Sequence, residues 1–151
     1  MKFYLKVFSV VFFCVFIFSC SPAHTLFVKN NTNSEKEIFV ELIENKFPER
    51  ILLCKELVSD ENLSYENFPK YYKNGKCFHE NINIVDNKIY KIKIPAKYTV
   101  NITPNNSIYP YQKIYYLVNG KKCFINDINS ESCVQKISQQ PKLVSITEIL
   151  Q

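Results

Sequence analysis

Cysteine is the residue type in this chain with the widest range of possible chemistry. The 151 residues contain six cysteines, and Cys14 and Cys20 lie in the first 20 positions. The other four are spread over the rest of the chain, at Cys54, Cys77, Cys123 and Cys133. A thiol can form a disulfide, bind a metal, attack a substrate or accept a fatty acid. The compartment in which the chain folds decides between these uses.

The N-terminal segment has the features of an export signal. After Lys2 and Lys6, residues 7–18 form an apolar run that is interrupted only by one serine and one cysteine. A run of this length is too short to cross a bilayer, which takes about 20 residues, but it fits the about 7–15 apolar residues of a secretory signal. We expect residues 1–19 to be a signal peptide.

Ile17, Phe18, Ser19 and Cys20 follow this run. They resemble the lipobox of bacterial lipoproteins, in the relaxed form found in spirochaetes, with Phe18 in the place of the usual small residue. In that family the signal is removed just before the cysteine, whose thiol becomes diacylglycerylated and whose amine is usually acylated. The resemblance implies that Cys20 carries fatty acids such as palmitate. It also implies a protein anchored at the bacterial outer membrane or cell surface, because two or more chains anchor stably.

Two other fates of the leader stay open. Ser21 and Ala23 also suit ordinary signal peptidase, which would cut after Ala23, discard Cys20 and release a secreted protein. The leader could instead be retained as an anchor. If Cys20 is the first residue, residues 20–24 are the anchored N-terminus and a tether that reaches roughly 13 Å. The folded part, residues 25–151, would then lie against the membrane as one domain.

The four remaining cysteines form an even set in an exported chain, which predicts two disulfides. We favour the two local pairings, because short loops close most easily and each stabilises by about 3 kcal/mol. These are Cys54 with Cys77 and Cys123 with Cys133; the crossed pairings stay open. No metal site is predicted, because no C-x-x-C pair occurs and His79 is too isolated from other ligands.

The sequence lacks the motifs of the common enzyme classes. The two glycines both lie in Asn-Gly pairs, which excludes a Walker phosphate loop and a dinucleotide fingerprint. No G-x-S-x-G motif occurs, and His79-Glu80 has no second histidine at metalloprotease spacing. We therefore expect no catalytic residues and no cofactor. The net charge of +5 falls to +3 without Lys2 and Lys6, which is too small a surplus to indicate a nucleic-acid partner.

Strand-like runs recur along the mature chain, at 25–29, 37–43, 51–57, 81–85, 89–95, 97–103, 113–118 and 122–125. Several alternate with period two: Tyr90, Ile92 and Ile94 face one way and the two intervening lysines the other. Only residues 59–68 and 146–150 are weak helix candidates. The pattern predicts an all-β fold, a single small antiparallel β-sandwich of Ig-like architecture with about seven or eight strands.

Each Asn-Gly pair, at 74–75 and 119–120, predicts a β-hairpin, because a type I′ turn needs positive φ at both central residues. Counting outward from either turn places the same Tyr-Cys and Tyr-Phe pairs opposite each other. A duplicated hairpin and chance in a biased composition both stay open as explanations.

Tyr109 and Tyr111 flank Pro110 and are candidates for binding a partner, because tyrosine offers a flat apolar face and a hydroxyl. The interpretation that we favour is that one or both of them cover the small core. We expect a membrane-anchored, non-enzymatic lipoprotein with a binding or structural role at the cell envelope or surface. Its partners would be the membrane and a host or envelope protein. The alternative is a secreted, disulfide-bonded inhibitor or ligand-binding module.

Overall fold

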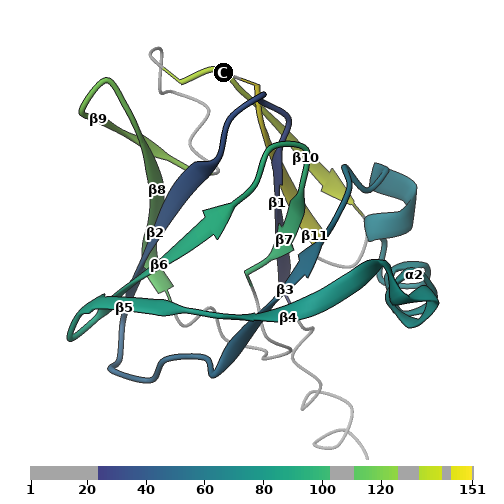
Figure 1. Cartoon of the computed structure of the whole chain (residues 1–151), viewed down its shortest axis with the longest axis horizontal. Helices are drawn as coiled ribbons and strands as arrows, with labels where there is room; N and C mark the ends of the chain where they lie inside the picture. Colours follow the sequence, from purple (N-terminus) through teal and green to yellow (C-terminus); the bar gives the residue numbers. More distant parts are fainter. Residues whose placement is uncertain (1–23, 103–110, 126–132, 141–143, 151) are drawn as a thin grey trace, which may run out of the picture.

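The computed structural model of the chain describes residues 24–102, 111–125, 133–140 and 144–150. Its strands are β1 (Thr25–Asn30), β2 (Lys36–Leu42), β3 (Arg50–Cys54), β4 (Cys77–Asn81), β5 (Asn83–Asp86), β6 (Ile89–Ile94), β7 (Thr99–Asn101), β8 (Tyr111–Val118), β9 (Lys121–Phe124), β10 (Gln135–Gln140) and β11 (Val144–Ile149). They form sheet A, in the order β10-β11-β1-β7-β3-β4, and sheet B, in the order β5-β6-β2-β8-β9 (Figure 1). The predicted all-β fold with two disulfides is confirmed.

One strand pair departs from the antiparallel arrangement that the sequence predicts. β1 runs parallel to β11, with Thr25 opposite Val144 and Asn30 opposite Ile149. The other pairs among the described strands are antiparallel. The described residues also hold eleven strands, more than the about seven or eight predicted, because β10 and β11 lie where no strand is expected and β4 is a strand separate from β5.

The main core lies between the two sheets. Side chains from β1, β3 and β7 of sheet A pack against side chains from β2, β6 and β8 of sheet B. In β6, Tyr90, Ile92 and Ile94 are buried, whereas the intervening lysines lie on the outer face, as the period-two pattern predicts.

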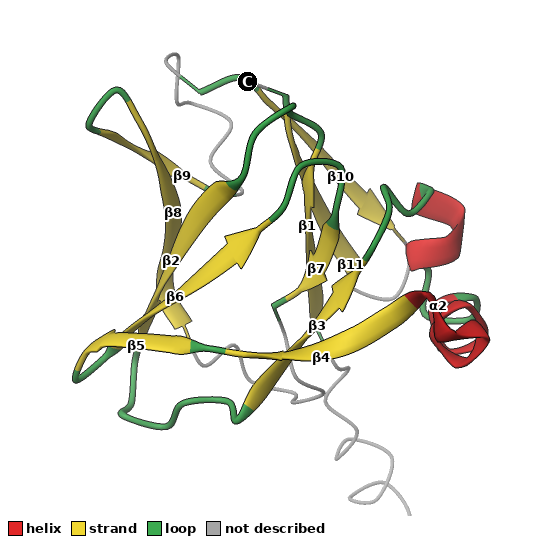
Figure 2. Cartoon of the chain, viewed as in Figure 1, coloured by secondary structure: helices red, strands yellow, loops and turns green. Residues whose placement is uncertain are grey.

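A second, smaller core lies on the outer face of sheet A. Residues 55–76, which we call the cap, cover this face between Cys54 and Cys77 (Figure 2). The cap contains the 3₁₀-helix η1 (Asp60–Leu63), the helix α2 (Phe68–Tyr71) and the turn of π-helix η2 (Tyr72–Lys76). The buried members of the second core are Phe27, Cys54, Val58, Leu63, Tyr71, Cys77, Val144 and Ile146.

The central strand β1 lies between these two cores. Leu26 and Val28 belong to the core between the sheets, whereas Phe27 belongs to the core under the cap. Residues 26–30 are all buried, so β1 has no solvent-facing side. The sequence of a strand that is covered on both faces is typically a nearly continuous apolar run, and any polar side chain in it needs a hydrogen-bond or charge partner.

Strands β4 and β5 join the two sheets at one edge. They lie at the edges of different sheets and are separated in the chain only by Ile82, which packs against the main core. Figure 1 shows them as one long ribbon along the lower side of the molecule. The chain therefore passes directly from sheet A to sheet B at the edge that carries His79.

The hairpin predicted at 119–120 is confirmed with its register. Tyr116 lies opposite Cys123 and Tyr115 opposite Phe124. The two turn residues have φ angles of 49° and 78°, the left-handed values that a type I′ turn requires.

The hairpin predicted at 74–75 is wrong. The preceding residues are helical, and Cys77 pairs with Cys54 of β3. Pro69 suits the first turn of a helix, and Gly75, with a φ of 73°, adopts the left-handed conformation that ends one. Asn-Gly therefore serves as a helix end here, and the idea of a duplicated hairpin loses its structural basis.

The two weak helix candidates have different outcomes. Residues 146–150 lie largely in β11, where Ile146, Thr147 and Ile149 are buried, so a helix there is wrong. Branched side chains favour a strand over a helix, and pairing with β1 decides the matter. Residues 59–68 contain η1 and are helical in part.

Candidate functional site

The cap is held to sheet A by a disulfide at its base. Cys54 and Cys77 lie directly opposite each other on β3 and β4 and are bonded, across a sequence separation of 23 residues. The second disulfide joins Cys123 of β9 to Cys133, ten positions later. Both favoured pairings are therefore found, and only the first of them encloses the cap.

Polar contacts also fasten the cap at its two ends. The Tyr71 hydroxyl donates a hydrogen bond to the Glu56 carboxylate, and the Lys76 ammonium donates to the same oxygen at 2.9 Å. These two partners hold the pKa of Glu56 below its ordinary value, the Tyr71 hydrogen bond contributing most. At the base, the Thr99 hydroxyl donates to the Glu56 carbonyl at 2.9 Å and accepts from the Val58 amide at 3.0 Å. The two ends of the cap are thus bonded to each other, and its base is bonded to β7.

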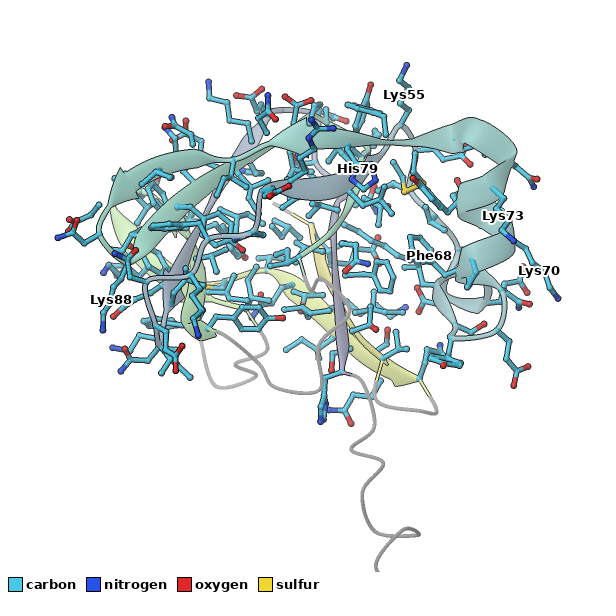
Figure 3. The ribbon with its side chains drawn as sticks, turned by 90° about the horizontal axis from the view of Figure 1, so that it is seen from below. Lys55, Phe68, Lys70, Lys73, His79 and Lys88 are labelled. Carbon is cyan, nitrogen blue, oxygen red and sulfur yellow. A yellow bond between two sulfur atoms is a disulfide. The ribbon has the colours of Figure 1, made fainter. Side chains whose placement is uncertain are left out.

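A pocket of about 480 Å³ opens between the cap and the outer face of sheet A. Most of its apolar lining comes from residues that are buried or half-buried: Phe27, Ile51, Leu52, Leu63, Phe68, Ile102 and Val144. Phe68 points from the helical segment toward the sheet, with its ring centroid 4.6 Å from that of Phe27 (Figure 3). This volume lies within the range of about 300–1,000 Å³ typical of pockets for small organic molecules.

Polar side chains line the pocket as well, at its exposed edge and also in its floor, where the half-buried Asn101 of β7 lies opposite Phe27 and Leu52. They are Thr25, Arg50, Ser64, Tyr65, Tyr72, His79 and Asn101. The Tyr72 hydroxyl and the His79 ring nitrogen Nε2 are 3.2 Å apart, which joins the cap to β4 across the pocket mouth. The residues that line the pocket include no aspartate or glutamate. Its mouth therefore offers hydrogen-bond donors and positive charge with no competing carboxylate.

The sheet register explains why Arg50 and His79 both lie at this mouth. Leu52 lies opposite His79, and Arg50 lies two residues before Leu52 on the same face of β3. Diagonal neighbours on one face of a sheet have Cα atoms about 7–8 Å apart, within reach of a long side chain. Among the described residues, Arg50 has no acidic partner within salt-bridge distance. The chain contains 18 lysines and this one arginine.

The residues singled out from the sequence lie elsewhere. Cys20 and Tyr109 are outside the described residues. Tyr111 begins β8, is half-buried, packs against the core between the sheets and is not among the residues that line the pocket. Sequence reasoning missed the pocket itself, although the alternation of Arg50, Leu52 and Cys54 on one face of a strand was a usable signal.

No protein-family model, curated protein or solved structure matches the chain. In the part of the chain that the structure describes, no helix combines the length and the apolar character needed to span a bilayer. Within the same ranges, no group of three or more His, Cys, Asp or Glu side chains is placed to hold a metal ion. The two disulfides are typical of proteins that fold in an oxidising compartment.

Proposed function

We propose that this protein is an exported lipoprotein, anchored to a bacterial membrane through Cys20, that works by binding a ligand and not by catalysis. The observation that carries the binding role is the pocket under the cap, with its mostly apolar interior and basic mouth. The two disulfides and the lipobox resemblance support export and anchoring.

The pocket lies close to the proposed anchor along the chain. Thr25, the first residue of β1, is part of the pocket lining. Cys20 precedes it by five positions, so their Cα atoms lie at most about 18 Å apart even if the chain between them is fully extended. A protein acylated at Cys20 would hold the pocket within this distance of the membrane surface.

The composition of the lining supports binding over catalysis. General acid–base and nucleophilic catalysis need a base or nucleophile within hydrogen-bond reach of a second activating group. The lining holds one imidazole, that of His79, whose Nε2 lies 3.2 Å from the Tyr72 hydroxyl, and it holds no carboxylate to orient or activate this ring. A mostly apolar interior with a few polar groups is typical of a site that orients an organic ligand.

The anchor is tested by metabolic labelling with an alkyne analogue of palmitate. Wild type and Cys14→Ala should incorporate the label, whereas Cys20→Ala should not, because Cys14 lies within the leader that is removed. Mass spectrometry of the N-terminal peptide should find an acylated Cys20. An unlabelled wild type whose chain begins at His24 would establish the secreted alternative, and label retained in Cys20→Ala would place the acyl group elsewhere.

A further inference from the structure

We propose that the pocket under the cap binds the hydrocarbon chain of an anionic amphiphile, with Arg50 and His79 at its mouth recognising the carboxylate or phosphate head. This inference deepens the proposed binding function by naming the class of ligand. It depends on the described part of the chain and not on acylation of Cys20.

The backbone around the pocket favours a hydrocarbon over a peptide. The strands that form its floor are β1, β7 and β3, and each is paired on both sides within sheet A. Their amide and carbonyl groups are therefore used in the sheet, whereas an extended peptide needs a free strand edge to pair with. The sheet contributes Phe27 and Leu52, with Asn101 of β7 opposite both of them, and the cap contributes Leu63 and Phe68. This mostly apolar surface suits a hydrocarbon chain, of which each buried CH₂ contributes about 0.8 kcal/mol.

The charges at the mouth select the head group. Arg50 presents a planar fork of N–H donors that fits a carboxylate or a phosphate through two parallel hydrogen bonds. His79 lies diagonally across the strand pair on the same face, and no acidic side chain lines the pocket. Lys70 and Lys73 project from the helical segment away from the body of the protein (Figure 3), so they do not contribute to this mouth. The basic groups that face the ligand are therefore Arg50 and His79.

The proposed anchor at Cys20, on which the inference does not depend, would provide a source for such a ligand. With the mouth held near a lipid surface by a short tether, single-chain anionic lipids would reach the pocket without crossing open solvent. Membrane-derived fatty acids and lysophospholipids share this chemistry: one acyl chain and a negative head.

The absence of tryptophan from the chain gives a clean fluorescence assay. Tyr65→Trp places a single reporter at the pocket, where the tyrosine is 58% exposed, and Leu117→Trp places one on the outer face of sheet B, where the leucine is 46% exposed. The full chain is mixed with phosphatidylcholine vesicles and titrated with 9,10-dibromostearate, whose bromines quench tryptophan at short range. We expect saturable quenching of the Tyr65→Trp reporter and only weak, non-saturable quenching of the Leu117→Trp reporter.

Head-group recognition is tested in the Tyr65→Trp background. Arg50→Gln should weaken binding of the brominated acid about tenfold, the effect of losing one charge-assisted pair at a partly exposed site. Lys73→Gln removes the same charge from the outer side of the cap and should leave binding unchanged. The methyl ester of the brominated acid should bind Arg50→Gln and the parent alike. All four substitutions change exposed side chains, and a thermal melt of each variant verifies the fold.

Two results would overturn the inference. One is equal quenching of both reporters, which would mean that the acid acts only from the bilayer. The other is equal binding of the brominated acid by Arg50→Gln and Lys73→Gln, which would mean that Arg50 does not bind the head group. Neither result bears on the acyl label at Cys20, so failure of this inference can be told apart from failure of the anchoring proposal.

Discussion

The ammonium group of Lys29, in the middle of sheet A, contacts the carboxylate of Asp60 in the cap. The Lys29 side chain is only 7% exposed, whereas that of Asp60 is 34% exposed. The Ser138 hydroxyl, on β10, donates to the other Asp60 oxygen at 3.1 Å. One carboxylate thus joins the cap to both the centre and the edge of sheet A, and it neutralises a lysine that β1 would otherwise bury alone.

Removing the Asp60 charge should destabilise the protein more than removing the whole ion pair. Asp60→Asn leaves the Lys29 ammonium buried without a counter-charge and should lower the free energy of unfolding by about 2–3 kcal/mol. The double variant Lys29→Met, Asp60→Asn removes both charges and should recover a large part of this loss. Urea denaturation followed by circular dichroism measures both effects. If the single and double variants lose the same free energy of unfolding, the unpaired charge of Lys29 is not the cause of the destabilisation.

The same pair predicts a loss of stability in acid. Burial raises the pKa of Asp60, but the hydrogen bond and charge of Lys29 and the Ser138 hydroxyl outweigh burial, so the pKa lies below its ordinary value of 3.8. A carboxyl with a lowered folded pKa contributes stability that is fully present above its unfolded pKa and is lost as the pH falls through the folded value. Urea midpoints measured from neutral pH down to about pH 2.5 should therefore fall more steeply in wild type than in Asp60→Asn. Parallel curves for the two proteins would contradict the assignment.

The two disulfides should be separable by their effect on the pocket. Replacing Cys54 and Cys77 by alanine should cost about 3 kcal/mol and should also weaken pocket binding, because the cap loses the covalent closure at its base. Replacing Cys123 and Cys133 should cost a similar amount but leave binding unchanged, because that bridge joins β9 to the segment before β10. Thermal melts and the brominated-acid titration measure the two properties in parallel. Equal loss of binding in both double variants would show that the effect is global.

The buried Tyr116 hydroxyl should be dispensable. The oxygen atom of this hydroxyl is buried and has no hydrogen-bond partner among the described residues, and burial raises the pKa of Tyr116. Tyr116→Phe should leave the stability unchanged or raise it by about 1 kcal/mol. Tyr71→Phe is the matched comparison, because it removes a hydroxyl that donates to Glu56 and should cost about 1–2 kcal/mol. A larger loss in Tyr116→Phe than in Tyr71→Phe would mean that the Tyr116 hydroxyl has a partner of its own.

Both glycines should be required for their backbone conformation and not for space. Gly75 and Gly120 have φ angles of 73° and 78°, and a Cβ added to either would meet nothing within 4 Å. Substitution by alanine should therefore cost about 1 kcal/mol at each site, the price of a left-handed conformation for an ordinary residue. Asparagine tolerates this conformation better, so Gly120→Asn should cost less than Gly120→Ala. Equal melting temperatures for these two variants would rule out backbone strain as the cause.

Much of the fold can be predicted from the sequence, because it depends on local patterns. Alternation in β6 shows which side chains are buried, and the turn at 119–120 fixes the register of its hairpin. Cys54–Cys77 and Cys123–Cys133 follow from the ease of closing short loops. Each of these features is decided within a short stretch of chain.

The features that sequence reasoning missed depend on distant partners. β11 has only a short apolar pattern, and it becomes a strand because β1 lies beside it. The Asn-Gly pair at 74–75 suits two turn types, and the helix that begins near Pro69 selects one of them. The pocket forms only when the cap folds back over sheet A. One inference was nevertheless within reach: a bond between Cys54 and Cys77 on neighbouring strands places His79 opposite Leu52.

The parallel pairing of β1 with β11 also governs when the molecule can fold. These two strands are the first and the last of the described chain, and β1 remains without one of its neighbours until residues 144–149 are present. If the chain is exported N-terminus first, as we propose, β1 would lack its β11 neighbour until the last residues emerge. A premature stop codon before Val144 would likewise leave the central strand β1 with an open edge, which exposes the chain to aggregation and proteolysis.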